Sequence, residues 1–391
     1  MKILMINSVC GIGSTGRICT DLATELEKQG HEVKIAYGRG EVPKQFSKYA
    51  IRVGNNLDVM LHGIKARVYD ASGFGSKRVT MRFIDWIESY NPDVIHLHNL
   101  HGYYINIDIL FEYLKKSDKK IIWTLHDCWS FTGHTVYCDT VNCEKWRYGC
   151  DKCPLLKEYP ATLLDNSRCN WNRKKELFTG ISNMMIITPS IWLSNLVKKS
   201  FLQEYVVEVI NNGINTTEFH SVCSNFRKEY GLEDKFILLG VATAWDDNKG
   251  LSDFFKLEKY LDNNYKIVLV GLTKKQIRKL PKNILGIERT ANIRQLAEIY
   301  TASNIFLNLS YCENYPTVNL ESMACGTSII AYGVGGNIEI VDKCGGRIVS
   351  KGDIQAVVRN IKQIQKEKLK INFKPEENDC AYAINKYLKY Y

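Results

Sequence analysis

Short apolar runs alternate with longer segments of helical periodicity through both halves of the chain. In the first half, the runs Lys2–Val9 and His31–Tyr37 flank the amphipathic segment Arg17–Gln29. In the second half, Leu251–Leu261 follows the run Phe236–Ala242 in the same way. Alternating strands and helices build parallel sheets with helices on both faces. Because 391 residues exceed one ordinary core, the pattern predicts an α/β protein with two Rossmann-like, doubly wound domains facing a central cleft.

The predicted domain boundary follows the strand Tyr205–Ile210, where the chain enters a polar turn that contains glycine. Residues 1–210 then form the first domain, with a cysteine-rich insert at 128–153, and residues 211–375 form the second. Residues 376–391 are expected to form a terminal helix. Its apolar side must pack on another element, and we expect it to pack back on the first domain.

Composition excludes several classes of protein. The chain is 45% hydrophobic and 24% charged, as in globular proteins, and no apolar run reaches the roughly 18 residues that span a bilayer. The net charge of +10 is not concentrated in a basic tail, so nucleic acid is not an expected partner. An anionic substrate or an anionic membrane surface is compatible with this charge. The chain has 13 cysteines, an odd number, and its first segment resembles a strand rather than an export signal. Both features predict a cytoplasmic protein with free thiols or a metal site.

Two glutamates mark the segment that follows the apolar run Asn304–Leu309. Glu313 lies on a predicted loop, and Glu321 lies eight residues later on a helix that starts near Pro316 and ends at Gly326. A loop carboxylate beside a helix N-terminus, with free backbone N–H groups between the two acids, suits a ligand with hydroxyls at both ends and phosphates in the middle. A nucleotide sugar has this layout. Spacing alone also fits two surface acids without a ligand.

A glycine-rich turn, Gly11-Ile12-Gly13-Ser14-Thr15-Gly16, follows the first strand and has the form G-x-G-x-x-G. In dinucleotide-binding proteins this turn is paired with an acid at the end of the second strand, which holds the ribose. Here that strand ends Tyr37-Gly38-Arg39-Gly40, without an acid. An NAD(P)-dependent oxidoreductase is therefore an alternative with one argument against it. A tight turn open to a phosphate or an acceptor explains the glycines equally well.

Three histidines, His96, His98 and His101, crowd the end of the predicted strand Asp93–Leu97. Strand ends of parallel sheets face the ligand crevice, so one of these histidines is a candidate substrate contact. Packing and backbone hydrogen bonding are the more common roles of alternating histidines, and metal binding is the less common one.

Five cysteines lie close together in the insert at 128–153. Four of them have the spacing Cys138-x4-Cys143-x6-Cys150-x2-Cys153, which could hold one structural Zn²⁺. His134 could replace one ligand. The arrangement lacks the two C-x2-C knuckles of common zinc modules, so free thiols or a disulfide remain alternatives. A non-catalytic zinc or protein-binding module is accordingly a second alternative function.

Taken together, these motifs resemble family-4 glycosyltransferases with the two-domain GT-B fold, and the resemblance covers essentially the whole chain. The motifs that carry it are Glu313–Glu321, Met323–Gly326, Val209–Ile214, Thr188–Ser190, Lys249–Gly250 and Gly335–Gly336. The first half resembles bacterial exopolysaccharide, capsule and colanic-acid-type transferases in particular. The segments concerned are His96–Gly102, Trp123–Asp127 and the cysteine-rich insert.

The resemblance implies transfer of a sugar from a nucleotide-diphosphate donor, a UDP- or GDP-sugar, to a lipid-linked or oligosaccharide acceptor in surface polysaccharide synthesis. It implies retention of configuration, no metal cofactor in catalysis, an acceptor-side first domain and a nucleotide-sugar-binding second domain. It also implies a cytoplasmic protein that associates peripherally with the inner membrane.

Carried over residue by residue, the resemblance implies that Glu313 holds hydroxyls of the donor sugar and that Glu321 holds the ribose hydroxyls of the nucleotide. Lys249 would neutralise the diphosphate, and His126 would contact the donor sugar from the first domain. Glu313, Lys249 and His126 are thus the implied catalytic residues. The remaining implied donor contacts are backbone groups and glycine turns, at Tyr315, Pro316, Thr317, Val318, Gly13 and Gly16.

One position departs from the family pattern. Family members usually have an arginine five residues before the lysine, and here that residue is Ala244. Asp246–Asp247 add negative charge between Ala244 and Lys249. Arg289 and Arg294 are the candidates to replace the missing cation as donor-binding residues.

Overall fold

The computed structural model describes residues 1–367 and 371–391. The chain forms two compact units. We call Met1–Ile210 with Ile384–Tyr391 the first unit, and Asn211–Ala383 the second unit. The unit boundary after residue 210 coincides with the boundary predicted from the sequence. Of the expected terminal segment 376–391, the part from Ile384 onward belongs to the first unit and the part before it to the second.

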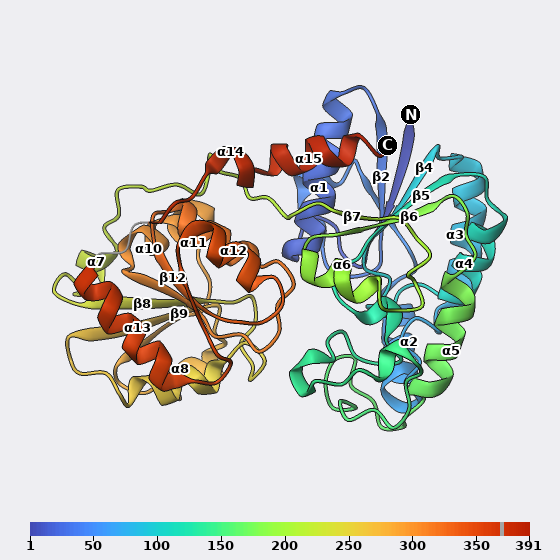
Figure 1. Cartoon of the computed structure of the whole chain (residues 1–391). Coiled ribbons are helices and arrows are strands. Elements are labelled where there is room, and N and C mark those ends of the chain that lie inside the picture. Colours follow the sequence, from blue (N-terminus) through green and yellow to red (C-terminus); the bar gives the residue numbers. More distant parts are fainter. Residues whose placement is uncertain (368–370) are drawn as a thin grey trace. The chain divides into compact units, whose positions relative to one another are not determined.

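The first unit contains a seven-stranded parallel sheet with the order β3-β2-β1-β4-β5-β6-β7. Its strands are β1 (Lys2–Ile6), β2 (Glu32–Tyr37), β3 (Ala50–Arg52), β4 (Val94–Leu97), β5 (Lys120–Thr124), β6 (Met184–Thr188) and β7 (Val207–Val209). Its helices are α1 (Gly13–Lys28), α2 (Asn56–Tyr69), α3 (Lys77–Tyr90), α4 (Ile107–Lys116), α5 (Ser167–Phe178) and α6 (Ile191–Val197), with a short 3₁₀ helix, η1 (Lys44–Phe46). The terminal helix α15 (Cys380–Leu388) belongs to this unit from Ile384 onward. Figure 1 shows α1 on one side of this sheet and α3 and α4 on the other.

The chain leaves β1 in one direction and returns to it from the other. It runs from β1 through β2 to β3 on one side, and then crosses to β4 on the opposite side of β1. Ile3 of β1 is in register with Val33 of β2 and with Val94 of β4. The loops that follow β1 and β4 therefore separate at their ends, which is where doubly wound sheets form a ligand crevice.

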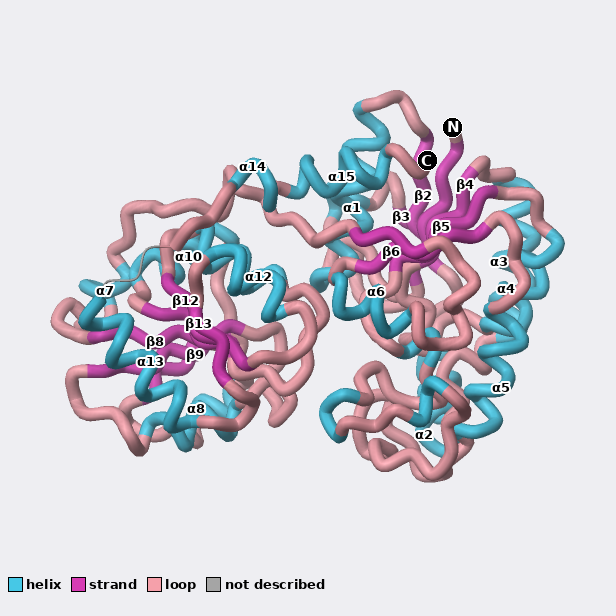
Figure 2. Tube along the Cα trace, viewed as in Figure 1, coloured by secondary structure: helices cyan, strands magenta, loops and turns pink. Residues whose placement is uncertain are grey.

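Between β5 and α5 the chain forms only 3₁₀ helices, η2 (Trp129–Phe131), η3 (Asp139–Val141) and η4 (Lys145–Arg147). Figure 2 shows this region largely as loop near α2. It contains the cysteine-rich insert.

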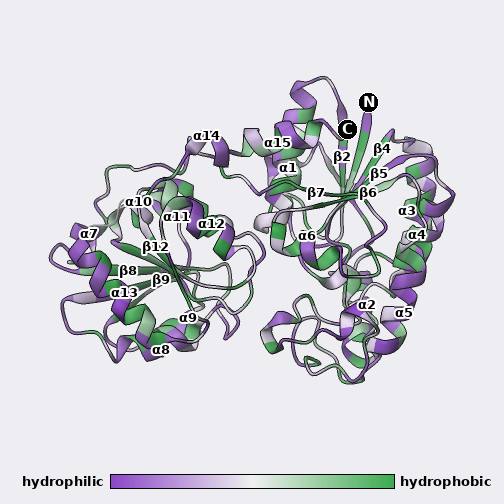
Figure 3. Ribbon diagram, viewed as in Figure 1, coloured by the Kyte–Doolittle hydropathy of each residue, from purple (hydrophilic) through white to green (hydrophobic). Residues whose placement is uncertain are grey.

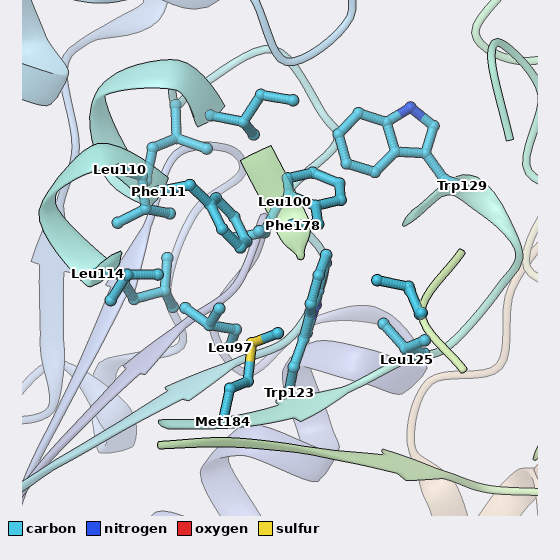
Figure 4. Close-up of a cluster of buried hydrophobic side chains, with 14 of the residues drawn as sticks. Leu97, Leu100, Leu110, Phe111, Leu114, Trp123, Leu125, Trp129, Phe178 and Met184 are labelled. Carbon is cyan, nitrogen blue, oxygen red and sulfur yellow. The ribbon is translucent and has the colours of Figure 1, made fainter. Parts of the chain in front are cut away.

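The strands of the first unit are buried on both faces, as parallel sheets require. In β1, every residue after Lys2 is fully buried. One core cluster packs β4 and β5 against α4 and α5 through Leu97, Phe111, Trp123 and Phe178 (Figure 4). The rings of Phe111 and Phe178 lie 4.3 Å apart, and this aromatic packing fixes the two helices on that face.

The second unit contains a six-stranded parallel sheet with the order β10-β9-β8-β11-β12-β13. Its strands are β8 (Phe236–Val241), β9 (Tyr265–Val270), β10 (Ile284–Ile287), β11 (Ile305–Asn308), β12 (Ser328–Tyr332) and β13 (Arg347–Val349). Its helices are α7 (Phe226–Glu229), α8 (Leu251–Glu258), α9 (Lys274–Ile277), α10 (Ile293–Ala302), α11 (Thr317–Ala324), α12 (Asn337–Cys344), α13 (Ile354–Glu367) and α14 (Pro375–Asn378).

The two faces of the second sheet are covered by different helices. Helices α10, α11 and α12 pack on one face, where Tyr300 and Leu320 are fully buried. Helices α8 and α13 pack on the other, where Phe254 and Ile361 are fully buried. Figure 3 shows the hydrophobic strands inside these layers. Both units therefore have the predicted doubly wound, Rossmann-like architecture.

The observed elements differ from the predicted ones mainly where a helix is short or has its apolar side chains exposed to solvent. No element was predicted for residues 41–80, yet β3, α2 and the start of α3 lie there. Helix α2 was not predicted because it does not bury a continuous row of apolar side chains, and four large aliphatic side chains on it are exposed. They are Leu57, Met60, Leu61 and Ile64. Among the described residues, no helix combines the length and apolar character that crossing a membrane requires.

Candidate active site

The centre of the second sheet brings together two of the predicted site residues. Strands β8 and β11 are neighbours in the sheet but not in the sequence, so their following loops diverge. Lys249 lies on the loop after β8, and Glu313 lies on the loop after β11. The Lys249 Nζ is 2.6 Å from Glu313 Oε1. The sequence predicted both residues at the ligand site but not the bond between them.

This ion pair is partly protected from water. The Lys249 side chain is 38% exposed and that of Glu313 only 11%. Burial alone would lower the pKa of Lys249, but the charge of Glu313 and its hydrogen bond outweigh burial and raise that pKa. Lys249 is therefore held as an ammonium group, available to a phosphate that approaches the same edge of the sheet.

Helix α11 begins beside Glu313, directly after Pro316. Pro316 is extended, with φ −73° and ψ 121°, and no side chain caps the first turn of the helix. The helix starts at Thr317, in agreement with the predicted start near Pro316. Uncapped N–H groups and the positive end of the helix dipole favour an anion at this position. Thr317 and Val318, both half-buried, form the first turn.

Glu321 lies farther along α11 and is not a surface acid. It is only 4% exposed, and its Oε2 accepts a hydrogen bond of 3.1 Å from the hydroxyl of Tyr300 on α10. Tyr315 is also buried, and its carbonyl accepts a hydrogen bond from Asn212. A carboxylate kept inside the protein at this position has a defined orientation, as expected of a group that binds ligand hydroxyls.

Gly335 explains one of the glycine motifs. Its φ is +51°, and a Cβ on it would lie 1.6 Å from the carbonyl oxygen of Glu313. The turn before α12 therefore presses directly on the Glu313 loop. Any side chain at this position would displace the loop that carries the predicted sugar contact.

A buried amide network, which the sequence did not reveal, fixes the ends of three elements. Asn308 ends β11, Asn319 lies on the first turns of α11, and Asn337 begins α12. Asn308 Nδ2 donates to Asn319 Oδ1 at 2.8 Å, and Asn319 Nδ2 donates to Asn337 Oδ1 at 2.9 Å. Asn337 donates in turn to the carbonyl of Tyr332. The only sequence signal was polar residues in otherwise apolar surroundings.

A second buried acid supports the same loops. Asp253 on α8 is fully buried and accepts hydrogen bonds from the hydroxyls of Tyr311 and Tyr332, at 2.8 and 2.7 Å. Burial alone would raise the pKa of Asp253, but Lys256 and the two tyrosine hydroxyls outweigh it and lower that pKa. Asp253 therefore links α8 to the loop after β11 as a carboxylate.

The two arginines predicted as substitutes lie on the surface of the second unit. Arg289 is exposed on the loop after β10, the edge strand of the sheet. Arg294 is exposed on α10, where its Nε is 3.5 Å from Glu298 Oε1. Their role in binding the diphosphate stays a prediction.

In the first unit, the glycine turn has the expected form. Gly13 is exposed with φ +64°, and a Cβ on it would meet open space. A Cβ on Gly16 would lie 3.1 Å from the backbone nitrogen of Gly11 and from a methyl group of Val9. Gly16 thus allows α1 to pack closely on the loop after β1, and Gly13 leaves the turn accessible to a ligand.

The predicted histidine cluster is divided into two parts. His126, after β5, has its Nε2 3.0 Å from Nδ1 of His98, after β4. Burial lowers the pKa of His126 to about 4, so it is a neutral hydrogen-bonding group near neutral pH. The other part is His101, whose Nε2 is 2.8 Å from Asp127 Oδ2 and whose Nδ1 is 3.2 Å from the hydroxyl of Tyr159.

The C-terminal residues of the chain support the buried histidines. The hydroxyl of Tyr391 contacts His96 Nδ1 at 2.5 Å, and His96 Nε2 is 2.8 Å from Thr124 Oγ1. Thr124 also contacts the hydroxyl of Tyr387 on α15. The rings of His96 and His98 are 4.1 Å apart. The terminal helix is therefore part of the packing behind His126.

Four of the five insert cysteines lie around one small cavity, and all five are free thiols. Cys138, Cys143, Cys150 and Cys153 line this cavity together with His134. Across residues 1–367 and 371–391, no three His, Cys, Asp or Glu side chains are arranged so that they could hold a metal ion as they stand. The sequence-based zinc site therefore stays a prediction.

Comparison with known proteins connects these features to a family. Residues 15–218 match the family model described as Glycosyltransferase Family 4, and residues 224–386 match the one described as Glycosyl transferases group 1. A protein of Escherichia coli (strain K12), WcaC, named for a glycosyl transferase role in colanic acid biosynthesis, is 24% identical over 382 residues. That match covers 92% of this chain and 90% of the relative.

Solved structures share the fold over the whole chain. Sucrose-phosphate synthase from Thermosynechococcus elongatus has a TM-score of 0.74 at 15% identity, covering 99% of this chain and 97% of its own. Anabaena HepE in complex with UDP has a TM-score of 0.69 at 13% identity, covering 100% and 99%. WaaG, a glycosyltransferase involved in lipopolysaccharide biosynthesis, has a TM-score of 0.60 at 13% identity, covering 98% and 93%. These likenesses show the GT-B fold.

Acid should destabilise the first unit through its buried histidines. Burial lowers the pKa of His96 to about 3 and those of His62 and His126 to about 4, against 6.5 in an unfolded chain. Between pH 6.5 and 4 the unfolded state therefore binds more protons, so the unfolding free energy should fall as pH falls, by about 1 kcal/mol or more for each histidine. The measurement is urea unfolding followed by tryptophan fluorescence, because six of the seven tryptophans lie in this unit.

The slope of stability against pH distinguishes this cause from general acid effects. His96→Gln should make that slope shallower, whereas His220→Gln, at an exposed position of the second unit, should leave it unchanged. An unfolding midpoint that stays constant from pH 6.5 to 4.5 would show that these histidines are not held neutral.

Proposed function

The chain belongs to glycosyltransferase family 4, and from this premise we propose that it transfers a sugar from a nucleotide-diphosphate donor to a lipid-linked glycan acceptor, with retention of configuration, in surface polysaccharide synthesis. It is a glycosyltransferase related to colanic acid and lipopolysaccharide transferases. The family decides against a nicotinamide-dependent oxidoreductase and against a non-catalytic module. The observation that carries the proposal is the Lys249–Glu313 ion pair beside the uncapped start of α11.

The arrangement in the second unit suits a sugar diphosphate. When the bond between the sugar C1 and the phosphate oxygen breaks, the leaving group gains negative charge, and stabilising that charge is the main catalytic task. Lys249 supplies a cation and the first turn of α11 supplies N–H groups. When Lys249 binds the diphosphate, Glu313 can accept hydrogen bonds from sugar hydroxyls. Glu321 can accept hydrogen bonds from the ribose hydroxyls. Because Ala244 replaces the usual arginine, the N-terminus of α11 must stabilise a larger share of the diphosphate charge.

Retention follows if the acceptor attacks from the face that the diphosphate leaves. In this scheme the acceptor oxygen bonds to C1, and its proton passes to the departing phosphate oxygen. We assign His126 to a hydroxyl of the reacting sugar, because it is neutral near pH 7 and can donate or accept a hydrogen bond without adding charge. The turn at Gly13 and Gly16 is our candidate for the acceptor side.

The solved HepE complexes contain UDP, UDP with glucose, and UDP-glucose. Their fold is shared with this chain, so UDP-sugars are the first donors to test, with GDP-sugars second. No metal takes part in the proposed transfer step, and sugar transfer should therefore proceed without added Mg²⁺ or Mn²⁺.

Removing either partner of the ion pair should abolish most activity without unfolding the protein. Lys249→Ala removes the cation that stabilises the leaving group, and Glu313→Gln removes a charged acceptor for the sugar. Each should lower kcat/KM by about 100-fold or more. The measurement is release of nucleoside diphosphate with a panel of donors, accompanied by thermal unfolding of each variant.

Matched controls lie on the exposed surface of the same unit. Lys259→Ala and Glu288→Gln change the same kinds of side chain at exposed positions and should keep wild-type rates. Full transfer by either Lys249→Ala or Glu313→Gln would rule out the assigned site.

A lipid-linked acceptor requires access to a membrane surface, and α2 offers one. Leu57, Met60, Leu61 and Ile64 follow the spacing of one helix face, and each is 53–57% exposed. Leu163 and Leu164, 66% and 50% exposed, are adjacent, since the backbone of Leu163 donates to the carbonyl of Arg67. Exposed basic residues accompany this apolar stripe. They are Lys65, Arg67, Lys77 and Arg78. We propose that this surface rests on an anionic lipid headgroup layer.

Charge on the apolar stripe should prevent membrane binding. Met60→Glu with Leu61→Glu should reduce binding to phosphatidylglycerol-containing vesicles by about tenfold or more, because two apolar groups would be replaced by charges that anionic lipid repels. Tyr260→Glu, an exposed aromatic of the second unit, is the control. Vesicle sedimentation measures the effect, and a wild-type protein that fails to bind these vesicles at low salt would contradict the proposal.

A further inference from the structure

The insert between β5 and α5 lacks the elements that ordinarily stabilise a folded region. It has three short 3₁₀ helices and no strand, yet Trp146 and Cys138 are buried in it. The catalytic proposal uses none of its cysteines. Their placement therefore calls for a separate explanation.

The first observation is a small cavity with soft ligands around it. His134 and four cysteines line a space of about 10 Å³, room for one water-sized sphere. Cys150 and Cys153 come from one turn. Cys138 and Cys143 come from another, which the backbone bond from Cys143 N to Cys138 O closes at 3.0 Å. Thiolates with an imidazole are the ligand class that zinc prefers.

The second observation is the orientation of His134. Its Nδ1 is 2.6 Å from Asp70 Oδ1, and the two side chains are 0% and 1% exposed. Its Nε2 is buried and has no hydrogen-bond partner among residues 1–367 and 371–391. A carboxylate that accepts from Nδ1–H leaves the Nε2 lone pair directed away from it, as in histidines that ligate zinc. An orphaned buried nitrogen beside four thiols is otherwise costly.

The third observation is backbone hydrogen bonding to two of the sulfurs. The backbone N–H of Gly133 donates to Cys150 Sγ at 3.3 Å. The backbone of Leu155 forms a hydrogen bond to Cys153. N–H groups that donate to sulfur compensate part of the net negative charge of a zinc–thiolate centre.

We propose that the insert binds one structural zinc ion through His134, Cys150, Cys153 and one thiol of the Cys138–Cys143 turn. These side chains do not surround an ion in the described residues as they stand, so the thiols must rotate about their Cα–Cβ bonds to close on it. Asp70 fixes the histidine, and the second thiol of the turn remains beside the centre.

The position of the insert gives the metal a consequence for the first unit. Thr135, next to His134, donates to the carbonyl of Tyr159 at 3.2 Å, and the Tyr159 hydroxyl contacts His101. His101 is paired with Asp127, which adjoins His126. Zinc would thus hold the loop that supports this group of side chains, a role in the fold rather than in the chemistry.

Metal analysis of the purified full chain tests the proposal directly. We expect one zinc per chain, lost in Cys150→Ser and Cys153→Ser but kept in Cys169→Ser, where the cysteine is exposed on α5. Asp70→Asn should keep the ligands but weaken zinc affinity by about 10–100-fold. Cobalt exchanged into the wild-type protein should show the sulfur-to-cobalt charge-transfer absorption of a thiolate centre.

Two results would overturn the inference. One is a wild-type protein with neither zinc nor a cobalt–thiolate band. The other is a disulfide among the insert cysteines, found by mass spectrometry after alkylation. If Cys150→Ser fails to fold, chelation of the wild-type protein decides the question, because a structural zinc site should lose thermal stability on chelation and regain it with added zinc.

Discussion

The ion pair between Lys249 and Glu313 joins the two loops that leave the centre of the second sheet. These loops follow adjacent strands but lead to helices on opposite faces, and the backbone bond from Tyr311 N to Asn248 O, at 2.7 Å, also links them. A carboxylate exposed by only 11% would be costly without a partner, and the ammonium group of Lys249 offsets that cost. The same contact keeps Lys249 charged at the position where a diphosphate would arrive.

The remaining structure of the second unit keeps that pair in place. The buried amides of Asn308, Asn319 and Asn337 tie the end of β11 to the starts of α11 and α12. Gly335 allows the turn before α12 to touch the Glu313 loop. Preorganised groups of this kind need no rearrangement when charge develops on a leaving group. The site is therefore a property of the packed sheet and its helices rather than of two catalytic residues alone.

Much of the fold and part of the site could be predicted from the sequence, for physical reasons. Buried parallel strands are continuous apolar runs, so the predicted runs His31–Tyr37 and Phe236–Ala242 match β2 and β8 to within one residue. The glutamate spacing placed Glu313 and Glu321 around a helix start. The asparagine network could not be predicted, because its members are far apart in the sequence and have no periodicity. Helix α2 was missed because its apolar face points to solvent. The role of Arg289 and Arg294, both exposed in the structure, stays a prediction.

The central claim is that the second unit binds a nucleoside diphosphate with Glu321 on the ribose. Calorimetric titration with UDP or GDP, and with the corresponding 2′,3′-dideoxy nucleotide, tests it in wild-type protein and in Glu321→Gln. Wild-type protein should lose about 10–100-fold in affinity when the ribose hydroxyls are removed, because hydrogen bonds to a charged group contribute that much. Glu321→Gln should bind both nucleotides with the same weak affinity. Equal binding of the two nucleotides by wild-type protein would contradict the assignment.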